Sequence, residues 1–247
     1  MKKHLFHFLY LLPFYFVQAQ DSIPIVKNIS LTQGLSHIVT KDLYRSPYLY
    51  KGLGYTASLT FERISSKSIH SVRAGIVLGA VKISFSSPAP VNMLDLEYYY
   101  LRKIVENKQF KFYLGGQLDG LSWRVNYFPK MEVPSYAKVH SHLLALSAGI
   151  ATRLEYRTGS RTAVRLSLHT PLCSYSDRPK FLDGSPRASQ FAVLNLWNPK
   201  LEVSFKYNVS KKITQTINYQ YEYLQYSKPK TIRLLSNGLS IGLKISF

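Results

Sequence analysis

A two-residue rhythm of apolar side chains is the feature of this sequence that most constrains its fold. Near the end of the chain, Leu239, Ile241, Leu243, Ile245 and Phe247 alternate with small or polar residues. Successive side chains of a strand point to opposite faces of a sheet, so the alternation predicts a strand with one apolar and one polar face. The pattern recurs upstream and predicts ten strands, at about 29–40, 49–64, 69–85, 92–105, 109–128, 139–157, 161–173, 191–209, 212–226 and 232–247.

The predicted connections are of two kinds, which alternate along the chain. Short turns lie at 65–68, 106–108, 158–160 and 210–211. Longer connections, richer in Pro, Ser and charge, lie at 41–48, 86–91, 129–138, 174–190 and 227–231. We expect each kind at its own end of an antiparallel sheet. The loop at 174–190 is the longest, and its composition leaves open whether it folds inward or projects.

One strand shows an irregular phase. Its apolar residues are even-numbered at Phe112 and Leu114 but odd-numbered from Leu121 through Trp123 and Val125. An extra residue shifts the phase of a strand by one position. The slip therefore predicts a β-bulge near Asp119-Gly120.

The first 19 residues have the composition of a targeting sequence. Met1-Lys2-Lys3 is followed by an apolar run from Leu5 to Val17 and by Val17-Gln18-Ala19, whose small final side chain suits signal peptidase. The run is shorter than the roughly 20 residues of a membrane-spanning helix. We therefore expect 1–19 to be a secretory signal peptide and 20–247 to be the mature domain. No later segment is apolar for long enough to predict a membrane helix.

Composition excludes several classes of protein. A hydrophobic share of 46% excludes a disordered chain, and a single cysteine excludes an internal disulfide framework. The 32 Lys and Arg against 13 Asp and Glu create a strongly positive potential. Nucleic acid is not the expected partner, because the sequence contains a signal peptide and no basic helix or recognisable nucleic-acid module.

Together these features resemble the small outer-membrane β-barrels of Gram-negative bacteria. The resemblance covers the whole mature chain and implies a ten-stranded antiparallel transmembrane barrel with both termini in the periplasm. A sheet in hydrocarbon must close, because an open edge leaves backbone polar groups unpaired. Tyrosines near strand ends, such as Tyr100 and Tyr156, fit an aromatic girdle. The last strand, with Leu243, Ile245 and Phe247, resembles the signal that the barrel-assembly machinery reads.

The competing prediction is a secreted soluble barrel or sandwich. Its strands also alternate, but the apolar face would point inward and the polar face outward. Alternation alone does not distinguish the two, whereas strand length, the terminal Phe247 and the loop asymmetry favour the membrane barrel.

If the apolar face meets lipid, the polar face lines the lumen. Acids and bases are nearly balanced there, which favours an ion-paired plug over the ring of one sign typical of a selective channel. Barrels of about ten strands also have interiors largely filled by side chains. The predicted lumen charge network comprises Glu62, Arg73, Glu97, Arg153, Glu155, Arg165, Glu202, Lys206, Glu222 and Lys244.

Catalytic patterns are weak in this sequence. Lipid-acyl hydrolases of this barrel class place His and Ser two residues apart on one lipid-facing strand, and no His-x-Ser occurs here. His70-Ser71 and the Ser141 between His140 and His142 are adjacent residues, which point to opposite faces. Outer-membrane proteases instead bring an Asp pair and an Asp-His pair to the outer rim, where the candidates are Asp42, Asp95, Asp177, Asp183, His37, His140, His142 and His169. We assign no catalytic residue from these patterns.

Metal binding and cofactors are likewise not predicted. His140 and His142 share one face, but the spacing implies no third ligand, so we assign no metal site. The sequence points to no cofactor.

Basic residues in the long connections suggest a partner. Phosphates of outer-membrane lipids and surface glycolipid would pair with Lys and Arg there, and general solubility is the alternative explanation. These residues are Lys130, Lys138, Arg178, Lys180, Arg187, Lys228, Lys230 and Arg233.

The sequence leaves three classes of function open. We favour a non-enzymatic barrel that is an envelope component or the partner of another envelope protein, with a largely plugged lumen. The first alternative is a small channel or porin, which requires a wet path past the lumen charges. The second is a lipid-modifying enzyme or protease, which requires a His and an acid or hydroxyl that converge at the outer rim.

Overall fold

The computed structural model describes residues 25–42, 48–83, 88–127, 139–178, 188–193, 196–226 and 231–247, all of them in strands or short connections. The strands are β1 (Val26–Asp42), β2 (Tyr50–Ile64), β3 (Ser68–Lys82), β4 (Ala89–Glu106), β5 (Phe110–Tyr127), β6 (Val139–Arg157), β7 (Thr162–Arg178), β8 (Ala188–Val193), β9 (Leu196–Trp197), β10 (Lys200–Asn208), β11 (Ile213–Tyr226) and β12 (Ile232–Ser246). Within these ranges no helix is long and apolar enough to cross a membrane. The expected signal peptide at 1–19 lies outside the described residues.

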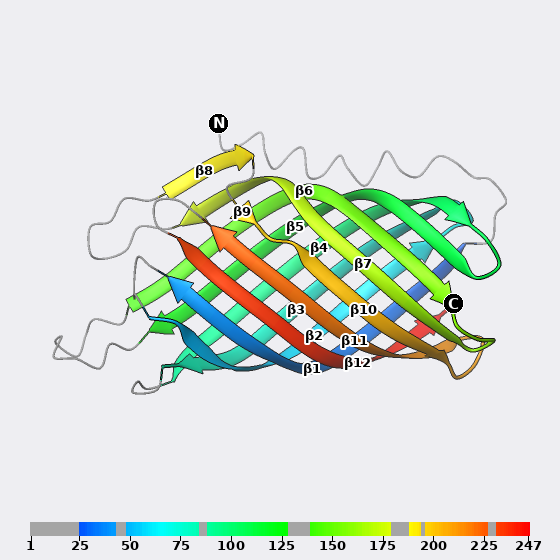
Figure 1. The fold of residues 1–247 in the computed structure, drawn as a ribbon, viewed down its shortest axis with the longest axis horizontal. Coiled ribbons are helices and arrows are strands. Elements are labelled where there is room, and N and C mark those ends of the chain that lie inside the picture. The colour runs from blue at the N-terminus through cyan, green and yellow to red at the C-terminus, as the bar shows by residue number, and fades with distance from the viewer. Residues whose placement is uncertain are drawn as a thin grey trace.

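The strands close into a ten-stranded antiparallel barrel (Figure 1). Strands β1 to β7 pair in sequence order, β7 pairs with β10, and β10 leads through β11 and β12 back to β1. The C-terminus lies at the end with the short turns, which we call the short-turn end; the opposite end is the long-loop end. The β1–β12 and β7–β10 pairings close the ten-stranded wall, which confirms the all-β antiparallel barrel expected from the sequence.

One predicted strand is divided. The segment expected as a single strand at 191–209 forms β8, β9 and β10, with Asn198-Pro199 between the last two. Proline has no N–H to donate to a ladder, which explains the interruption. Because β8 pairs with Cys173–Arg178, β7 extends five residues beyond its predicted end and takes up part of the expected loop 174–190.

The bulge predicted near Asp119-Gly120 was wrong. The β4–β5 and β5–β6 registers continue without a shift through those residues. Register shifts lie instead between Lys103 and Val105, and where Ala148 and Gly149 face β7. Leu121, Trp123 and Val125 therefore belong to the inward face, on which Gln117 also lies.

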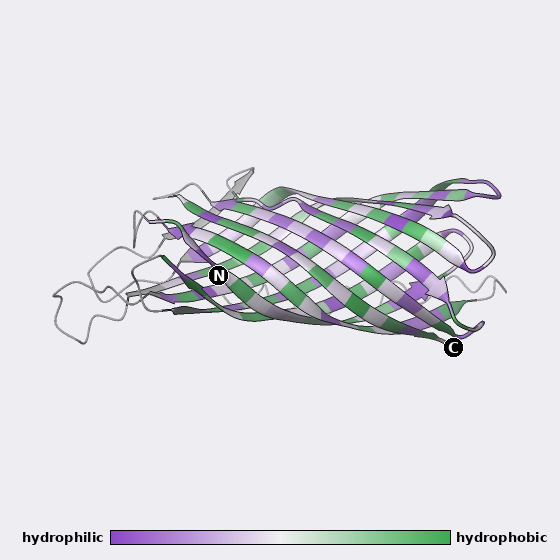
Figure 2. Cartoon of the chain, turned by 60° about the horizontal axis from the view of Figure 1, so that its bottom comes forward, coloured by the Kyte–Doolittle hydropathy of each residue, from purple (hydrophilic) through white to green (hydrophobic). Residues whose placement is uncertain are grey.

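The two faces of the barrel wall differ in chemistry. Outward side chains are mostly apolar and exposed, for example Leu35, Leu53 and Leu239, each at least 60% accessible. Hydrophobic and hydrophilic residues alternate along the strands in Figure 2. The interior changes along the axis: it is mostly polar and ion-paired from the short-turn end to the middle, with a small apolar cluster around Leu101, and mostly apolar at the long-loop end. The polar residues of a soluble barrel would face outward, which is the reverse of what this barrel shows.

Candidate functional site

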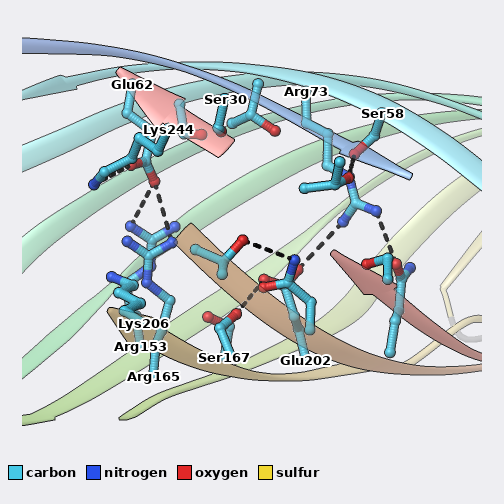
Figure 3. A pocket seen from close by; sticks show the side chains of 18 of the residues that line it. Ser30, Ser58, Glu62, Arg73, Arg153, Arg165, Ser167, Glu202, Lys206 and Lys244 are labelled. Carbon is cyan, nitrogen blue, oxygen red and sulfur yellow. Dashed lines mark hydrogen bonds and ion pairs between the residues drawn. The ribbon is translucent and has the colours of Figure 1, made fainter. Parts of the chain in front are cut away.

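An ion-paired cluster occupies the interior nearer the short-turn end (Figure 3). Glu62, which is almost fully buried, accepts a hydrogen bond from Arg153 at 3.0 Å and lies 3.5 Å from Arg165. Glu155 lies 2.9 Å from both Arg165 and Lys206. Lys244 completes the cluster at 3.9 Å from Glu62. Such sharing satisfies several buried charges at once.

A second cluster lies in the middle of the interior, around Lys200 at the start of β10. Its Nζ lies 2.5 Å from Glu97 Oε1, 3.2 Å from Asp119 Oδ2 and 3.6 Å from Glu222 Oε1. All four side chains are at most 8% accessible.

Arg73 joins the middle cluster to other strands. Its guanidinium lies 3.7 Å from Glu97 and 3.3 Å from Glu202, and it donates to Gln220 at 2.8 Å. Each residue of the lumen charge network named from the sequence thus points inward and takes part in an ion pair. The functional role of that network stays a prediction.

Two central members were missed by sequence reasoning. Asp119 was not named among the lumen charges, although it lies two residues from the inward Gln117 on the same face of β5. Lys200 was overlooked although it shares parity with Glu202 on the same strand. Residues two apart on an uninterrupted strand point to the same face, and this rule would have identified both.

An apolar cluster fills the interior at the long-loop end. Its residues come from β1 to β6, β9, β11 and β12. Trp123 and Leu143, two of its members, are at most 1% accessible. Its members are Ile38, Tyr50, Val81, Ala89, Val91, Met93, Leu121, Trp123, Val125, Leu143, Ala145, Leu196, Leu224, Tyr226, Ile232 and Leu234. On β5 the apolar residues lie outward as far as Leu118 and inward from Leu121, which explains why the sequence suggested a change of phase.

Small polar cavities remain between these clusters. One of about 70 Å³ is lined by Arg73, Tyr99 and His169 among others, and one of about 30 Å³ lies near Asp95 and Ser236. Each has room for little more than a few water molecules.

The four candidate histidines do not converge. His169 is buried in the interior, where Nδ1 pairs with Gln117 Oε1 at 3.0 Å and the ring packs against Tyr99. His37 faces outward on β1. His142 also faces outward, and its Nε2 lies 3.4 Å from Ser122 Oγ. The side chain of His140 lies outside the described residues.

The candidate acids do not come together in a pair, although Asp177 lies diagonally across from His142 on the outer face. Asp42 lies in the interior, where Ser141 donates to its carboxylate, and Asp95 lies in the interior at mid-height. Asp177 faces outward on β7, and Asp183 is outside the described residues. The Asp pair and Asp-His pair of a rim protease are therefore not assembled from the described candidates. Nor do three His, Cys, Asp or Glu side chains group for a metal ion anywhere in that part of the chain.

The remaining sequence candidates lie on the surface. Leu243, Ile245 and Phe247 all face outward and are 46–60% accessible. Of the basic residues named in the long connections, the side chain of Arg233 alone lies among the described residues. It is exposed on β12.

Arg233 belongs to a row of outward cations near the long-loop end. Arg233 is the register partner of Lys41 on β1. Val39, two residues from Lys41 on the same face of β1, is the register partner of Lys51 on β2. Lys51 in turn pairs with Lys82 on β3. We call Arg233, Lys41, Lys51 and Lys82 the cationic row; it crosses four adjacent strands.

Comparisons with known proteins agree with the fold. No family model and no curated protein matches this sequence. The outer membrane protease OmpT from Escherichia coli has a TM-score of 0.54 at 11% identity, covering 90% of this chain and 96% of its own. The translocator domain of the autotransporter NalP from Neisseria meningitidis has a TM-score of 0.45 at 8% identity, covering 100% and 96%. At such identity the likeness to OmpT concerns architecture alone, and this chain has the fold of the bacterial outer-membrane β-barrels.

Proposed function

We propose that this protein is an outer-membrane barrel with an occluded interior, an envelope component or partner subunit that does not act as a channel. One observation carries the proposal: side chains from around the barrel circumference meet in the apolar cluster of Trp123 and Leu143. An apolar constriction excludes ions because it does not hold their hydration shells. The ion pairs beneath it neutralise the charges that would otherwise attract a permeating ion.

Planar-bilayer conductance of the refolded full-length mature chain tests this proposal. A heat-dependent shift of gel mobility first demonstrates that the barrel is closed. We expect no current steps from the wild type and measurable steps from the double variant Trp123→Ala, Leu143→Ala, which opens the apolar cluster. The matched control is Leu118→Ala, an outward apolar residue of β5 that is 47% accessible. Reproducible steps from the folded wild type would establish the channel instead.

Export and assembly complete the proposal. Removal of residues 1–19 would leave Gln20 as the first residue, and the barrel-assembly machinery would then insert the chain from the periplasm of a Gram-negative cell. The outward apolar row of Leu243, Ile245 and Phe247 supports that route, since such a row suits a lipid-facing strand. The mass of the protein purified from membranes tests the cleavage site directly.

Surface glycolipid is the partner we propose for the cationic row. Lys51 and Lys82 are register partners, so two like charges lie side by side on the outward face. Cross-strand like charges are unfavourable unless an anion lies between them. Phosphate groups at the level of the long-loop end would supply that anion.

A further inference from the structure

The outward face of β4 to β7 carries three short rows of register partners near the long-loop end. The central row is Leu94, Ser122, Leu144 and Asp177. The row toward the short-turn end is Leu96, Gly120, Leu146 and Tyr175. In the row toward the long loops, Arg124 lies opposite His142. Ser122, His142 and Asp177 thus share one face of three adjacent strands.

The side chains of Ser122 and His142 make contact. Ser122 Oγ lies 3.4 Å from His142 Nε2, although the two residues belong to different strands. The separation is longer than a strong hydrogen bond, as is common between a nucleophile and its base when substrate is absent.

Asp177 stands on the other side of the same histidine. It is the register partner of Leu144, which lies two residues from His142 on the same face, so the carboxylate and the imidazole are diagonal neighbours. A hydroxyl, an imidazole and a carboxylate therefore follow one another across the wall in the order that nucleophilic catalysis uses.

An apolar groove of about 410 Å³ begins at this point of the wall. Gly120 forms its floor, because it leaves a gap between Leu96 and Leu146 in the row below Ser122. Ser122 and Asp177 are among the residues that line the groove, and leucines and Tyr175 make up most of the rest. We call this feature the acyl groove. A straight hydrocarbon chain fits a groove of this chemistry.

We propose that Ser122, His142 and Asp177 form an acyl-transfer centre on the outer wall, whose substrate is the ester of a membrane phospholipid with one chain in the acyl groove. Three observations support it: the Ser122–His142 contact, the placement of Asp177, and the groove that ends at Ser122. The proposal concerns the outer wall and does not depend on whether the interior conducts. It departs from the non-enzymatic role expected from the sequence.

The reaction balances with groups that the site and its surroundings supply. Ser122 Oγ attacks the ester carbonyl carbon while His142 Nε2 takes the hydroxyl proton. The tetrahedral intermediate then collapses, the C–O bond to the glycerol oxygen breaks, and His142 returns the proton to that oxygen. Water, deprotonated by His142, attacks the acyl carbonyl carbon; the bond to Ser122 Oγ then breaks, His142 returns the proton to that oxygen, and a fatty acid is released. Asp177 orients the imidazole and stabilises its protonated form.

The location favours a phospholipid over a soluble ester. The ester of a phospholipid lies between its chains and its headgroup, and Ser122 lies between the apolar row of Gly120 and the polar row of Arg124. The exposed guanidinium of Arg124, directly opposite His142, is placed to pair with the headgroup phosphate. Chain, ester and phosphate would thus occupy three successive rows of the wall.

Labelling with a fluorophosphonate probe tests the nucleophile. The full-length mature chain is refolded in micelles, its closure is verified by heat-dependent gel mobility, and the labelled residue is identified by mass spectrometry. We expect covalent label on Ser122, no label in Ser122→Ala, and a large loss in His142→Asn. Thr152→Ala, which removes another outward hydroxyl from β6, should label like the wild type. A folded wild type that takes no label, or a Ser122→Ala variant that keeps it, would overturn the proposal.

Ester turnover tests the substrate. Vesicles of phosphatidylethanolamine with a fluorescent acyl chain should release fatty acid with the wild type, and Ser122→Ala and Asp177→Asn should lower the rate by roughly 10⁴-fold. A parallel arm uses glycolipid vesicles. Release from glycolipid alone would overturn the phospholipid assignment, and the absence of release from either lipid would overturn the activity.

Discussion

Lys200 Nζ lies 2.5 Å from Glu97 Oε1, and the two side chains are 5% and 1% accessible. They come from β10 and β4, so this pair spans the barrel interior. Tyr99 also donates to Glu97, which leaves the carboxylate with partners from two directions. Removing one partner of such a pair leaves a buried charge uncompensated.

Lys200→Met should therefore destabilise the barrel by about 3–5 kcal/mol, because Glu97, Asp119 and Glu222 would lose their shared cation. Urea unfolding in lipid micelles, followed by tryptophan fluorescence, measures the change. Lys108→Met, at an exposed short turn, is the control and should change stability by less than about 0.5 kcal/mol. An equal effect of the two variants would show that the central cluster contributes nothing specific.

Gly149 should tolerate no side chain. It lies at the β6–β7 register shift, where a Cβ would stand 2.1 Å from the carbonyl oxygen of Thr170. Gly149→Ala should slow refolding and lower the temperature at which gel mobility shifts. Gly116→Ala on the neighbouring strand is the matched control, since its nearest contact would be an ordinary 3.7 Å. The prediction fails if both alanine variants refold alike.

The cationic row should bind phosphorylated glycolipid. Replacing Lys51 and Lys82 with Gln removes two adjacent charges, so we expect weaker binding with a shallower dependence on salt concentration. Binding to glycolipid micelles can be followed by tryptophan fluorescence at two salt concentrations. The control, Lys67→Gln with Lys212→Gln, removes two exposed charges at the short-turn end. Should the control lose as much affinity, attraction by the net charge would explain the binding.

The acyl groove can be filled without touching the three residues of the acyl-transfer centre. A Cβ at Gly120 would meet Leu146 Cδ2 at 3.4 Å, so Gly120→Leu fits the wall but occupies the groove. It should abolish phospholipid turnover while Ser122 still takes the small fluorophosphonate probe. Gly116→Leu places the same side chain on β5, outside the groove, and should retain turnover. Normal turnover by folded Gly120→Leu would show that the chain binds elsewhere.

The strands of this barrel could be predicted closely, because alternation is a local property of the chain. The predicted 139–157 coincides with β6, and the predicted 212–226 differs from β11 by one residue. Prediction failed on β5, where the apolar residues change from the outward face, at Leu118, to the inward face, at Leu121 and Trp123, without any bulge. Alternation shows that a strand has one apolar face, but it does not show whether that face meets the interior or the lipid.

The sequence by itself determined the hairpins, the alternating faces and the inward placement of charges such as Glu62 and Arg153, since each follows from parity along a strand. Tertiary structure alone decided which residues meet. Ser122 and His142 are 20 residues apart and touch because the β5–β6 register places Arg124 opposite His142. Register depends on the pairing of whole strands across a connection, and a shift of one residue would turn His142 to the other face.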